Sequence, residues 1–381
     1  MYDYVIVGAG LAGCVMAERI GNVLNKKVLI IEKRNHIGGN CYDYHDKNGI
    51  LIHKYGPHIF HTNLENVWKY LSNFTNWYRY QHKVLGFIDG KNVPIPFNLN
   101  TLNNLLPESI AKNLENKLID NFGIDEKIPI LKLKDIEDFK FLSNFVYEKI
   151  FLNYTKKQWG MKPDDLDPSV TERVPVFISK DNRYFQDKYQ GIPREGYTKI
   201  FERMLKNENI KIMLSTDFKE IITIYNNYLC LFGNKFMGKL IFTGKIDEFF
   251  DYKFGELPYR SLKFDFEKIN QEYFQEVGTI NYPNDYDFTR ITEFKHFTYQ
   301  KHPNTTIVKE FTQEHNKNIK GKDIPYYPIP KKENVDIYEK YKEESNKYNN
   351  VFFVGRLAEY CYYNMDIVIH RALETFEEKI K

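Results

Sequence analysis

The stretch that decides the fold is Tyr4-Val5-Ile6-Val7-Gly8-Ala9-Gly10-Leu11-Ala12-Gly13, at residues 4–13. The β-branched run up to residue 7 predicts a buried strand, the glycines predict a turn, and residues 11–24 have the apolar character of a helix. Residues 28–31 predict a second buried strand. The order strand, glycine turn, helix, strand is typical of a Rossmann-like α/β domain.

The glycines of this turn follow the GxGxxG spacing of dinucleotide-binding sites. Gly8 permits the tight turn, Gly10 lets the backbone approach a pyrophosphate, and Gly13 allows the helix to pack closely on the strand. The amino end of the helix offers N–H groups and a positive dipole to phosphates. Glu32, 19 residues after Gly13, closes the second strand, where its carboxylate can accept hydrogen bonds from ribose hydroxyls. We therefore predict a bound dinucleotide rather than an unliganded glycine turn.

The residues after Glu32 indicate which dinucleotide binds. Lys33 and Arg34 suit a 2′-phosphate, but the neighbouring carboxylate of Glu32 would repel that group, which disfavours NADP. The following Gly38-Gly39-Asn40 is similar to the second glycine motif of a large flavoprotein group, in which paired glycines run past the cofactor. The segment therefore favours FAD over NAD.

Length and composition restrict the class of protein. The 381 residues allow two or three domains. A net charge of only +3, from 54 basic and 51 acidic residues, lacks the concentrated positive field that nucleic-acid binding needs. No apolar run approaches the roughly 18 residues of a membrane span, and Asp3 before the apolar amino-terminal run argues against a signal peptide. Four scattered cysteines, Cys14, Cys41, Cys230 and Cys361, predict free thiols in a cytoplasmic protein.

The remaining chain predicts two further parts and a return to the first. Residues 102–150 carry apolar residues at helical spacing, interrupted by Pro107, Gly123 and Pro129, and predict several short helices. Alternating runs between 173 and about 189, and between 259 and 310, predict antiparallel strands that form a platform beneath a cleft. Buried strands at 240–243 and 351–354, each followed by glycine, suit the first sheet.

The predicted fold is thus α/β, with a discontinuous Rossmann-like FAD-binding domain, an inserted helical domain and an antiparallel-sheet substrate domain. The FAD-binding domain takes residues 1–90, 192–250 and 346–381. The helical insert takes residues 98–150, and the substrate domain takes residues 151–191 and 251–345.

Residues 53–62, HKYGPHIFHT, hold three histidines and raise the question of a metal site. Pro57 breaks helical spacing and no Asp or Glu lies within the segment, so we predict no metal. Our interpretation is that the chain passes the flavin ring here, with Gly56 allowing close approach. His61 would then face the substrate as a hydrogen-bonding group of a residue type that titrates near neutrality. A buried structural histidine is the competing interpretation.

Residues 154–160, YTKKQWG, place two aromatic residues around a polar stretch that suits stacking on a nucleotide base, with core packing as the alternative. With this segment the sequence closely resembles the bacterial UDP-galactopyranose mutases, along nearly its whole length and in collinear order. The matching stretches are HKYGPHIFHT at 53, PIPFNLNT at 94, YTKKQWG at 154, RVPV at 173, DNRYFQDKYQGIP at 181, GYTKIFERML at 196, YRSLKF at 259, FTRITEFKHF at 288, PYYP at 325 and GRLAEYCYYNM at 355.

The resemblance implies an isomerase that interconverts the pyranose and furanose forms of UDP-galactose without net redox change. In the family, N5 of reduced, noncovalently bound FAD forms an adduct at the anomeric carbon and displaces UDP. The resemblance also implies a cytoplasmic homodimer that supplies galactofuranose donors for cell-surface polysaccharide. Neither a nucleic acid nor a membrane is expected as a partner.

The resemblance also assigns the site residues. Arg173, Arg290 and His61 are expected to be catalytic, since paired guanidinium groups stabilise a diphosphate leaving group better than ammonium groups do. Surface salt bridges are the alternative interpretation of the two arginines. The other expected substrate contacts are His82, Tyr154, Thr155, Trp159, Tyr184, Asn281, Tyr327 and Tyr362. The expected cofactor contacts are Gly8, Gly10, Ala12, Gly13, Glu32, Lys33, Gly39, Asn40, His58, Ile59, Arg260, Gly355, Arg356 and Met365.

Four positions depart from the usual family pattern. Asn364 replaces an aspartate, Phe177 an arginine, Glu172 a basic residue and His82 an asparagine. We interpret these changes as altering sugar specificity, for example towards the N-acetylated substrate. Two other classes stay open: an amine-oxidase-like flavin oxidoreductase, which a lipophilic substrate tunnel would support, and a non-catalytic FAD-binding partner protein.

Overall fold

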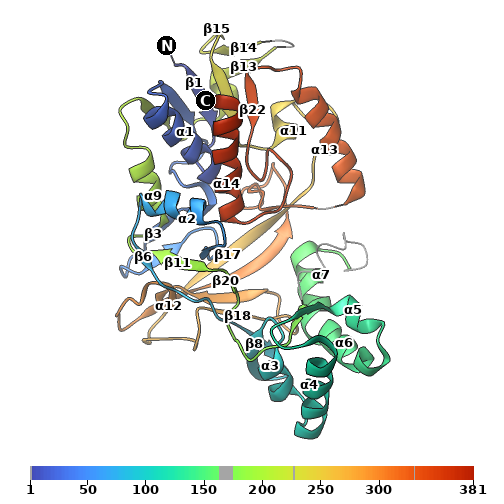
Figure 1. Ribbon diagram of the computed structural model, residues 1–381. Helices are drawn as coiled ribbons and strands as arrows, with labels where there is room; N and C mark the ends of the chain where they lie inside the picture. The colour runs from blue at the N-terminus through green and yellow to red at the C-terminus, as the bar shows by residue number, and fades with distance from the viewer. Residues whose placement is uncertain (1, 163–174, 226–227, 330) are drawn as a thin grey trace.

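A five-stranded parallel sheet forms the half of the molecule that holds both chain ends (Figure 1). The computed structural model describes residues 2–162, 175–225, 228–329 and 331–381. The strand order is β12 (Ile210–Met213), β2 (Val28–Ile31), β1 (Tyr4–Val7), β16 (Lys239–Phe242) and β22 (Val351–Phe353). All neighbours pair in parallel, which confirms the Rossmann-like prediction and the return of the two late strands.

The two faces of this sheet have different cores, because alternate side chains of a strand point in opposite directions. Ile6 packs into a cluster with the helices of one face, and Val5 and Val7 pack into a cluster on the other face. The first face is covered by α1 (Leu11–Val23), α2 (Glu65–Ser72), α9 (Tyr197–Met204) and α14 (Met365–Thr375), which ends in a π-helical turn at Phe376–Ile380. The second is covered by α10 (Phe218–Ile221), α11 (Ile246–Phe249) and an unpredicted small sheet of β13 (Ile222–Ile224), β14 (Leu229–Leu231) and β15 (Asn234–Phe236).

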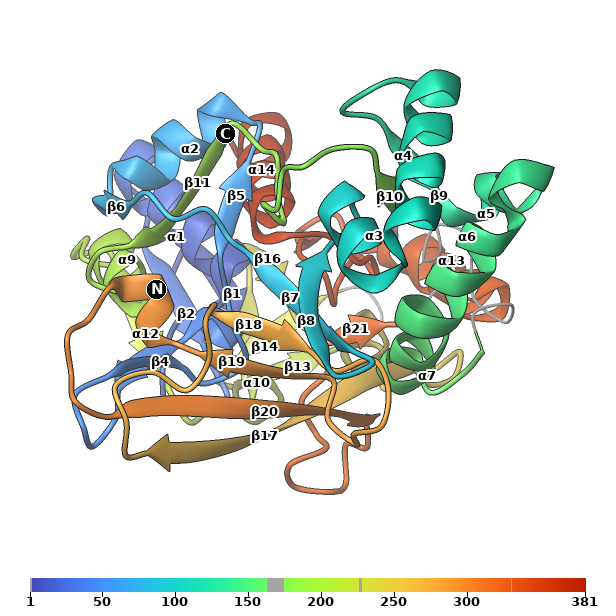
Figure 2. The ribbon, with the colours of Figure 1, turned by 90° about the horizontal axis from the view of Figure 1, so that it is seen from below.

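A second, seven-stranded sheet forms the predicted platform, whose long strands run side by side in Figure 2. Its order is β21 (Tyr327–Pro328), β17 (Tyr259–Ile269), β20 (Thr305–Glu314), β19 (Arg290–Glu293), β18 (Thr279–Asn281), β7 (Val84–Ile88) and β8 (Lys91–Ile95). The pairs are antiparallel except β18 with β7, which is parallel. The short helix α12 (Lys295–Thr298) interrupts the predicted strands between 259 and 310.

The strand prediction between 173 and 189 was largely wrong. Within the described part of that stretch, β10 (Pro175–Phe177) and the first residue of β11 (Tyr189–Pro193) are the only strand residues. Asp181 accepts hydrogen bonds from the backbone and side chain of Arg183, a local contact that competes with a strand ladder. β11 pairs instead with β5 (Phe60–Thr62) and β6 (Trp77–Tyr78).

The short helices predicted for residues 102–150 are present and lie to one side of the platform, together with α7, which follows residue 150 (Figure 2). Pro107 is the N-cap of α4, Gly123 ends that helix at φ +88°, and Pro129 precedes α5, as the sequence indicated. The elements are α3 (Leu99–Leu105), α4 (Glu108–Phe122), β9 (Lys127–Pro129), α5 (Ile130–Lys134), a 3-10 turn (Glu137–Phe139), α6 (Lys140–Val146), a π-helical segment (Tyr147–Leu152) and α7 (Asn153–Trp159).

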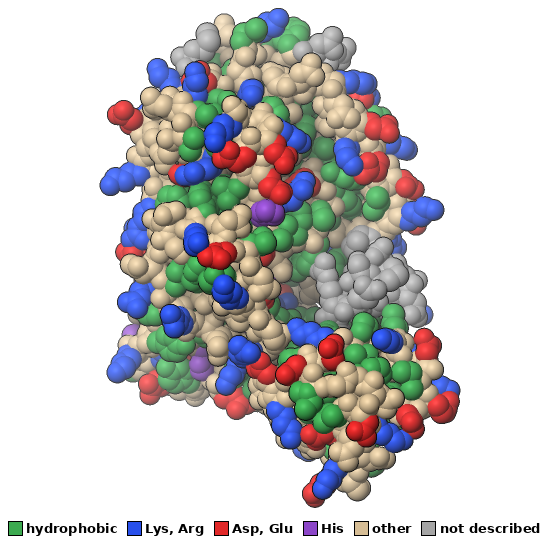
Figure 3. Space-filling view, viewed as in Figure 1, with side chains coloured by type: hydrophobic (Ala, Val, Ile, Leu, Met, Phe, Trp, Pro, Cys, Tyr) green, Lys and Arg blue, Asp and Glu red, His purple; other side chains and the backbone are tan. Residues whose placement is uncertain are grey.

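The remaining elements are β3 (Asp43–His45) paired with β4 (Leu51–His53), a 3-10 turn (Gly39–Cys41) and α13 (Lys332–Ser345). Basic and acidic side chains are interspersed over the face seen in Figure 3. In the described part of the chain, no helix has the length and apolarity to cross a membrane. Cys14, Cys41 and Cys230 are buried thiols, and Cys361 is exposed.

Candidate active site

A cavity of about 1000 Å³ is lined by residues of the parallel sheet, the platform and α7. Its walls include the glycine turn after β1, the segments 38–41 and 55–59, residues of six strands of the platform and the loops that precede α14. This volume lies at the upper end of the range of about 300–1,000 Å³ that ligand sites occupy.

Two glycine segments form the floor of the cavity on the parallel-sheet side. Gly8 has a φ of +102°, and a Cβ on Gly13 would lie 2.0 Å from the carbonyl oxygen of Gly8, so only glycine allows α1 to pack this closely. A Cβ on Gly39 would lie 2.8 Å from the Cα of Gly10, so the two glycine segments touch. Within the described residues, the first turn of α1 has no side-chain cap, which leaves its N–H groups for an anion.

Glu32 ties this turn to the end of β2. Its side chain is 6% exposed and accepts hydrogen bonds from the backbone N–H groups of Ala9 and Arg34, both at 2.8 Å. A carboxylate has about four lone-pair sites, so Glu32 can still accept hydrogen bonds from a ribose. Arg34 donates from Nη2 to Asn40 at 2.9 Å, whereas its Nη1 is buried without a hydrogen-bond partner among the described residues.

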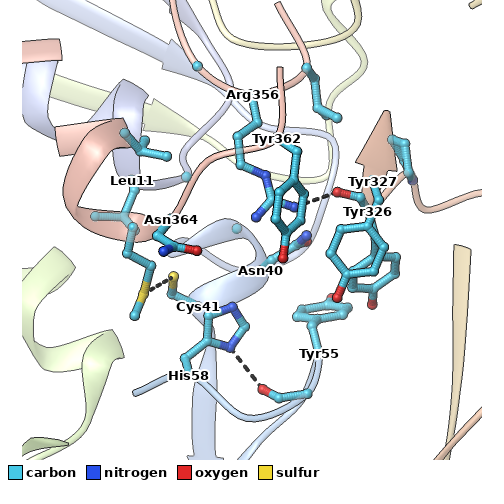
Figure 4. A pocket seen from close by; sticks show the side chains of 18 of the residues that line it. Leu11, Asn40, Cys41, Tyr55, His58, Tyr326, Tyr327, Arg356, Tyr362 and Asn364 are labelled. Atoms are coloured by element: carbon cyan, nitrogen blue, oxygen red, sulfur yellow. Dashed lines mark hydrogen bonds between the residues drawn. The ribbon is translucent and has the colours of Figure 1, made fainter. Parts of the chain in front are cut away.

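The part of the cavity next to α14 is drawn in Figure 4. The guanidinium of Arg356 donates to the carbonyl oxygen of Tyr326 and lies 5.7 Å and 5.4 Å from the ring centres of Tyr327 and Tyr362. Burial lowers the pKa of His58 to about 3. Its imidazole is therefore neutral at pH 7 and donates from Nδ1 to the carbonyl oxygen of Gly56 at 2.8 Å. No group of three or more metal-ligating side chains occurs in the described ranges.

A row of polar side chains crosses the platform. Asn281 on β18 lies opposite Arg290 on β19, which lies opposite Glu310 on β20. The Nε of Arg290 is 3.2 Å from a Glu310 oxygen, but neither atom makes a well-aligned hydrogen bond. The Nη2 of Arg290 donates to the Tyr154 hydroxyl at 2.9 Å.

Unsatisfied polar atoms gather in this cavity. Six buried side-chain atoms that lack a hydrogen-bond partner among the described residues belong to side chains of its lining. They are Arg34 Nη1, Gln158 Oε1, Thr279 Oγ1, Asn281 Oδ1, Arg290 Nε and Glu310 Oε1. Buried polar groups without partners are rare in proteins, so this concentration indicates a site built for a polar ligand.

The charges of the row follow from burial and proximity. Burial is the largest single influence and lowers the pKa of Arg290, but the Glu310 carboxylate and the neighbouring tyrosines together outweigh it and raise that pKa above the ordinary arginine value. Burial raises the pKa of Glu310, although Arg290 opposes this shift. Burial also raises the pKa values of Tyr154, Tyr184 and Tyr327, so these hydroxyls stay protonated and can donate hydrogen bonds at neutral pH.

Three stacked rings form another wall. The His61 ring lies 3.6 Å from the Phe185 ring at 13°, and Phe185 lies 6.0 Å from the His82 ring at 28°. Nδ1 of His61 is 3.0 Å from a carboxylate oxygen of Asp187, whose other oxygen accepts a hydrogen bond from Asn63. Burial lowers the pKa of His82 to about 3, so this imidazole is neutral.

Most of the predicted site residues come together around this cavity. The predicted residues that line it are Gly8, Gly10, Ala12, Glu32, Lys33, Gly39, Asn40, His58, Ile59, His61, His82, Tyr154, Thr155, Trp159, Tyr184, Asn281, Arg290, Tyr327, Gly355, Arg356, Tyr362 and Met365. Gly13 lies behind the lining and packs α1 on the strand, as expected. Arg173 and Glu172 lie outside the described residues.

Arg260 is a second predicted cofactor contact that does not line the cavity as described. Its guanidinium was expected beside the flavin, but among the described residues it is not part of the cavity lining. It donates instead to the carbonyl oxygens of Lys157 and Gln158 at the end of α7. The reason is its place on β17, where the side chain meets the carboxyl end of that helix.

Sequence reasoning missed Phe185, Asp187 and Glu310. Phe185 and Asp187 belong to the stretch DNRYFQDKYQGIP, whose part before β11 is an irregular loop, so periodicity could not assign them to a wall. Glu310 belongs to the alternating run of β20, but its contact with Arg290 depends on the register between β19 and β20. A buried acid within a predicted strand was the one available signal.

The fold and the site together define a Rossmann-like dinucleotide-binding protein with a charged substrate platform. The family model described as UDP-galactopyranose mutase matches residues 149–362, and the one described as NAD(P)-binding Rossmann-like domain matches residues 6–74. The chain is 37% identical to a dTDP-fucopyranose mutase of Escherichia coli, covering 100% of this chain and 99% of that protein. It is 35% identical to a UDP-galactopyranose mutase of Mycoplasma genitalium, covering 97% and 92%. The chain belongs to the UDP-galactopyranose mutase family.

Solved structures show the same fold. A crystal structure of reduced UDP-galactopyranose mutase matches with a TM-score of 0.72 at 17% identity, covering 99% of this chain and 93% of that chain. A putrescine oxidase variant matches with a TM-score of 0.56 at 11% identity, covering 100% and 99%. The fold is therefore shared with a putrescine oxidase, and function has to be argued from the site.

Proposed function

We propose that this chain is an isomerase that interconverts UDP-galactopyranose and UDP-galactofuranose, with FAD as its noncovalent cofactor. The observation that carries the proposal is one continuous cavity that joins the glycine turn to the row Asn281, Arg290 and Glu310. A dinucleotide at the first end and a sugar diphosphate at the second would meet inside it.

The residues of the first end suit FAD. The backbone of Gly8, Gly10 and Ala12 and the uncapped turn of α1 would hold its pyrophosphate, and Glu32 would hold the adenosine ribose. The other cofactor contacts proposed are Lys33, Gly39, Asn40, His58, Ile59, Gly355, Arg356 and Met365, which line the same cavity. Reduced FAD, once bound, supplies the nucleophilic nitrogen that displaces the nucleoside diphosphate from the anomeric carbon.

The second end suits a leaving diphosphate. Arg290 places a fixed positive charge where negative charge develops on the leaving group. Arg173 is proposed as its partner on the resemblance alone. The protonated hydroxyls of Tyr154, Tyr184 and Tyr327 can donate to phosphate oxygens, and we propose Tyr362 with them.

The base and the sugar take the remaining walls. We propose that Tyr154, Thr155 and Trp159 of α7 bind the base, since an aromatic ring can stack on any nucleobase. His61, His82 and Asn281 would contact the sugar. Because His82 is neutral and its Nδ1 contacts the Tyr80 hydroxyl at 3.3 Å, its Nε2 can either donate to or accept from a sugar hydroxyl, according to the tautomer.

Sugar choice is argued from the residues that reach the cavity. His82 and Asn364 line it, whereas Phe177 is a buried residue of β10 and, in the described structure, lies outside the lining. We therefore propose that His82 and Asn364, rather than Phe177, set any difference in sugar specificity. The name of the Escherichia coli relative adds dTDP-fucose to the substrates worth testing.

The oxidoreductase alternative receives less support. A lipophilic tunnel would favour it, but this cavity contains a buried Arg290–Glu310 pair and the polar groups of Thr279 and Asn281. These groups suit a sugar diphosphate rather than a hydrocarbon chain or an amine.

The decisive experiment is an anaerobic assay of dithionite-reduced protein with UDP-galactofuranose, its N-acetylated counterpart and dTDP-fucofuranose, each offered separately. We expect chromatography to show conversion of UDP-galactofuranose to the pyranose form, and only with reduced protein. Conversion of only one of the other two nucleotide sugars would show that this one, rather than UDP-galactose, is the substrate. A failure to convert any of them, with FAD bound, would remove the isomerase proposal.

On the resemblance we also propose a cytoplasmic homodimer that supplies a cell-surface polysaccharide pathway. Light scattering coupled to size-exclusion chromatography tests the dimer. We propose the three-part division of the chain as predicted, with one change. The first FAD-binding segment ends before β7 rather than at residue 90, because β7 pairs with the platform.

A further inference from the structure

Helix α7 carries three proposed nucleotide contacts on only seven residues. Tyr154, Thr155 and Trp159 all line the cavity, so the position of this one helix decides where they point. The helix ends at Gly160, which has a φ of +70°. What holds that end in place therefore affects the whole base-binding wall.

The carboxyl end of α7 is attached to the platform by side chains. Arg260 on β17 donates from Nε to the carbonyl oxygen of Gln158 at 3.0 Å and from Nη2 to that of Lys157 at 3.3 Å. The hydroxyl of Thr312 on β20 donates to the same Lys157 oxygen. The ammonium of Lys157 donates in return to the carbonyl oxygen of Tyr282, at 2.7 Å.

Arg260 has little freedom to do anything else. Arg260 is 6% exposed. Glu314 lies opposite it on β20 and its charge acts on the guanidinium, but the described residues show no ion pair within 4.0 Å between the two. Burying an uncompensated charge is costly, and the last carbonyls of a helix carry partial negative charge. The carbonyl oxygens at the end of α7 are thus the direct hydrogen-bond partners of this guanidinium.

Gly160 shows how tight the contact is. A Cβ on that residue would lie 2.7 Å from Nη1 of Arg260. Any side chain at position 160 therefore has to displace the guanidinium or the end of the helix.

We propose that Arg260 is a positioning residue, which holds α7 against the platform and thereby sets the affinity for the nucleotide. The inference rests on the proposed function in one respect, that α7 binds the base. It extends to the phosphate, because Tyr154 of α7 accepts a hydrogen bond from Arg290 at 2.9 Å. Loosening the helix removes a partner that orients Arg290.

The test compares nucleotide affinity with cofactor retention in the oxidised holoprotein. The variants are Arg260→Met, Arg260→Lys and Gly160→Ala. Arg203→Met is the matched control, because Arg203 also donates to a backbone carbonyl, that of Phe74 at 2.9 Å, but outside the lining of the cavity as described. Calorimetry gives the Kd for UDP and for dTDP, and visible absorbance gives FAD per protein.

We expect Arg260→Met to raise the Kd of the nucleotide that the wild type binds by about tenfold or more, the range for a lost hydrogen bond to a charged group. FAD content stays at the wild-type value. Arg260→Lys keeps the charge but not the planar guanidinium, so its nucleotide Kd falls between those of the wild type and Arg260→Met. Gly160→Ala raises the Kd as Arg260→Met does, and Arg203→Met leaves the Kd unchanged. Acrylamide quenching of the tryptophan fluorescence increases in Arg260→Met, since the release of the helix end exposes Trp159, one of the three tryptophans of the chain.

Three results overturn the proposal. Loss of FAD with unchanged nucleotide affinity in the remaining holoprotein makes Arg260 a flavin contact instead. An equal loss of nucleotide affinity in Arg203→Met would show that the loss in Arg260→Met comes from a general loss of stability. If Arg260→Met does not fold, unchanged nucleotide affinity in both Arg260→Lys and Gly160→Ala refutes the positioning role of Arg260. A wild type that binds neither UDP nor dTDP contradicts the proposed function instead, and is recognised before any variant is compared.

Discussion

Arg290 is the residue whose charge matters most to the proposed reaction. Glu310 neutralises it in the free protein at 3.2 Å, and a diphosphate would compete for the same guanidinium. We predict that Arg290→Ala nearly abolishes turnover. Arg290→Lys keeps a charge but loses the planar fork, and should lower kcat by about 10²–10³-fold, the range for a lost transition-state donor.

The measurement is turnover of reduced protein, with FAD content and the UDP Kd as companions. FAD content should not change, because Arg290 stands on the platform rather than on the glycine turn. Near-normal activity of Arg290→Ala would take this residue out of the mechanism.

Asp187 is a second residue near the proposed reaction, and its carboxylate orients the ring of His61. To donate to the carboxylate at 3.0 Å, Nδ1 of His61 carries a proton, which leaves Nε2 for the sugar. Asp187→Asn keeps the size of the side chain but replaces the acceptor pair with an amide. We predict a fall in kcat of about 10–100-fold, the usual cost of losing an orienting partner, with the UDP Kd unchanged.

A double-mutant cycle checks this coupling. If Asp187 acts through His61, the combination of His61→Gln and Asp187→Asn is no slower than His61→Gln alone. Asp181→Asn is the control, since Asp181 lies on the same loop but pairs with Arg183. Additive losses would show that the two residues act separately.

The contact between the two glycine segments gives a prediction at the scale of elements. Gly39 has a φ of +56°, and a Cβ there would lie 2.8 Å from the Cα of Gly10. Gly39→Ala therefore has to separate the segment after β2 from the turn after β1. We predict a protein that folds but retains little FAD, measured by its absorbance spectrum.

Gly49→Ala is a control for strain in this experiment. Gly49 also has a positive φ, of +78°, but none of the described atoms lies within 4 Å of the added Cβ. Both substitutions cost strain of about 1–3 kcal/mol, so a difference in FAD content isolates the contact. Equal loss of FAD in both variants would contradict the prediction.

Elements with local signals were predicted well. The glycine turn, the buried strands and the breaks at Pro107, Gly123 and Pro129 each depend on a few neighbouring residues, and the structure confirms them. The platform was predicted from alternation, but its register was not. Whether Asn281, Arg290 and Glu310 stand in one row depends on how three strands align, which no single segment encodes.

The contacts of Arg260 could not be predicted from its segment for a similar reason. Its motif is part of a strand, and the resemblance implied a flavin contact. The direction of its side chain, towards the end of α7, follows from the packing of that helix on the platform. Long-range packing of this kind is beyond pattern reading, whereas the glycine turn is a property of one segment.

At the scale of the whole molecule, segments far apart in sequence depend on each other. β1 at the start of the chain pairs with β2 on one side and with β16 on the other, and β16 pairs with β22 near the end. α1 and α14 pack into one core over the same face (Figure 1). The complete parallel sheet therefore contains strands from three passes of the chain, between which the chain enters the platform twice.

This architecture predicts how the cofactor affects stability. The cavity is lined by the parallel sheet, the platform and α7, so a ligand that fills it contacts all three. A ligand that binds only the folded state stabilises it by about 2.7 kcal/mol at a concentration of 100 Kd. Adding FAD to the apoprotein should therefore raise the Tm of the whole cooperative transition, in proportion to the logarithm of its concentration.

NAD at the same concentration is the matched comparison, because it shares the adenosine and the pyrophosphate but lacks the flavin. If the segments 38–41 and 55–59 are built for the flavin, NAD raises the Tm far less than FAD, and Gly39→Ala removes most of the FAD effect. Equal shifts would mean that the glycine turn alone provides the affinity. A shift confined to one of two separate transitions would mean that the parallel sheet and the platform unfold independently, because only the part that holds the ligand gains its binding free energy.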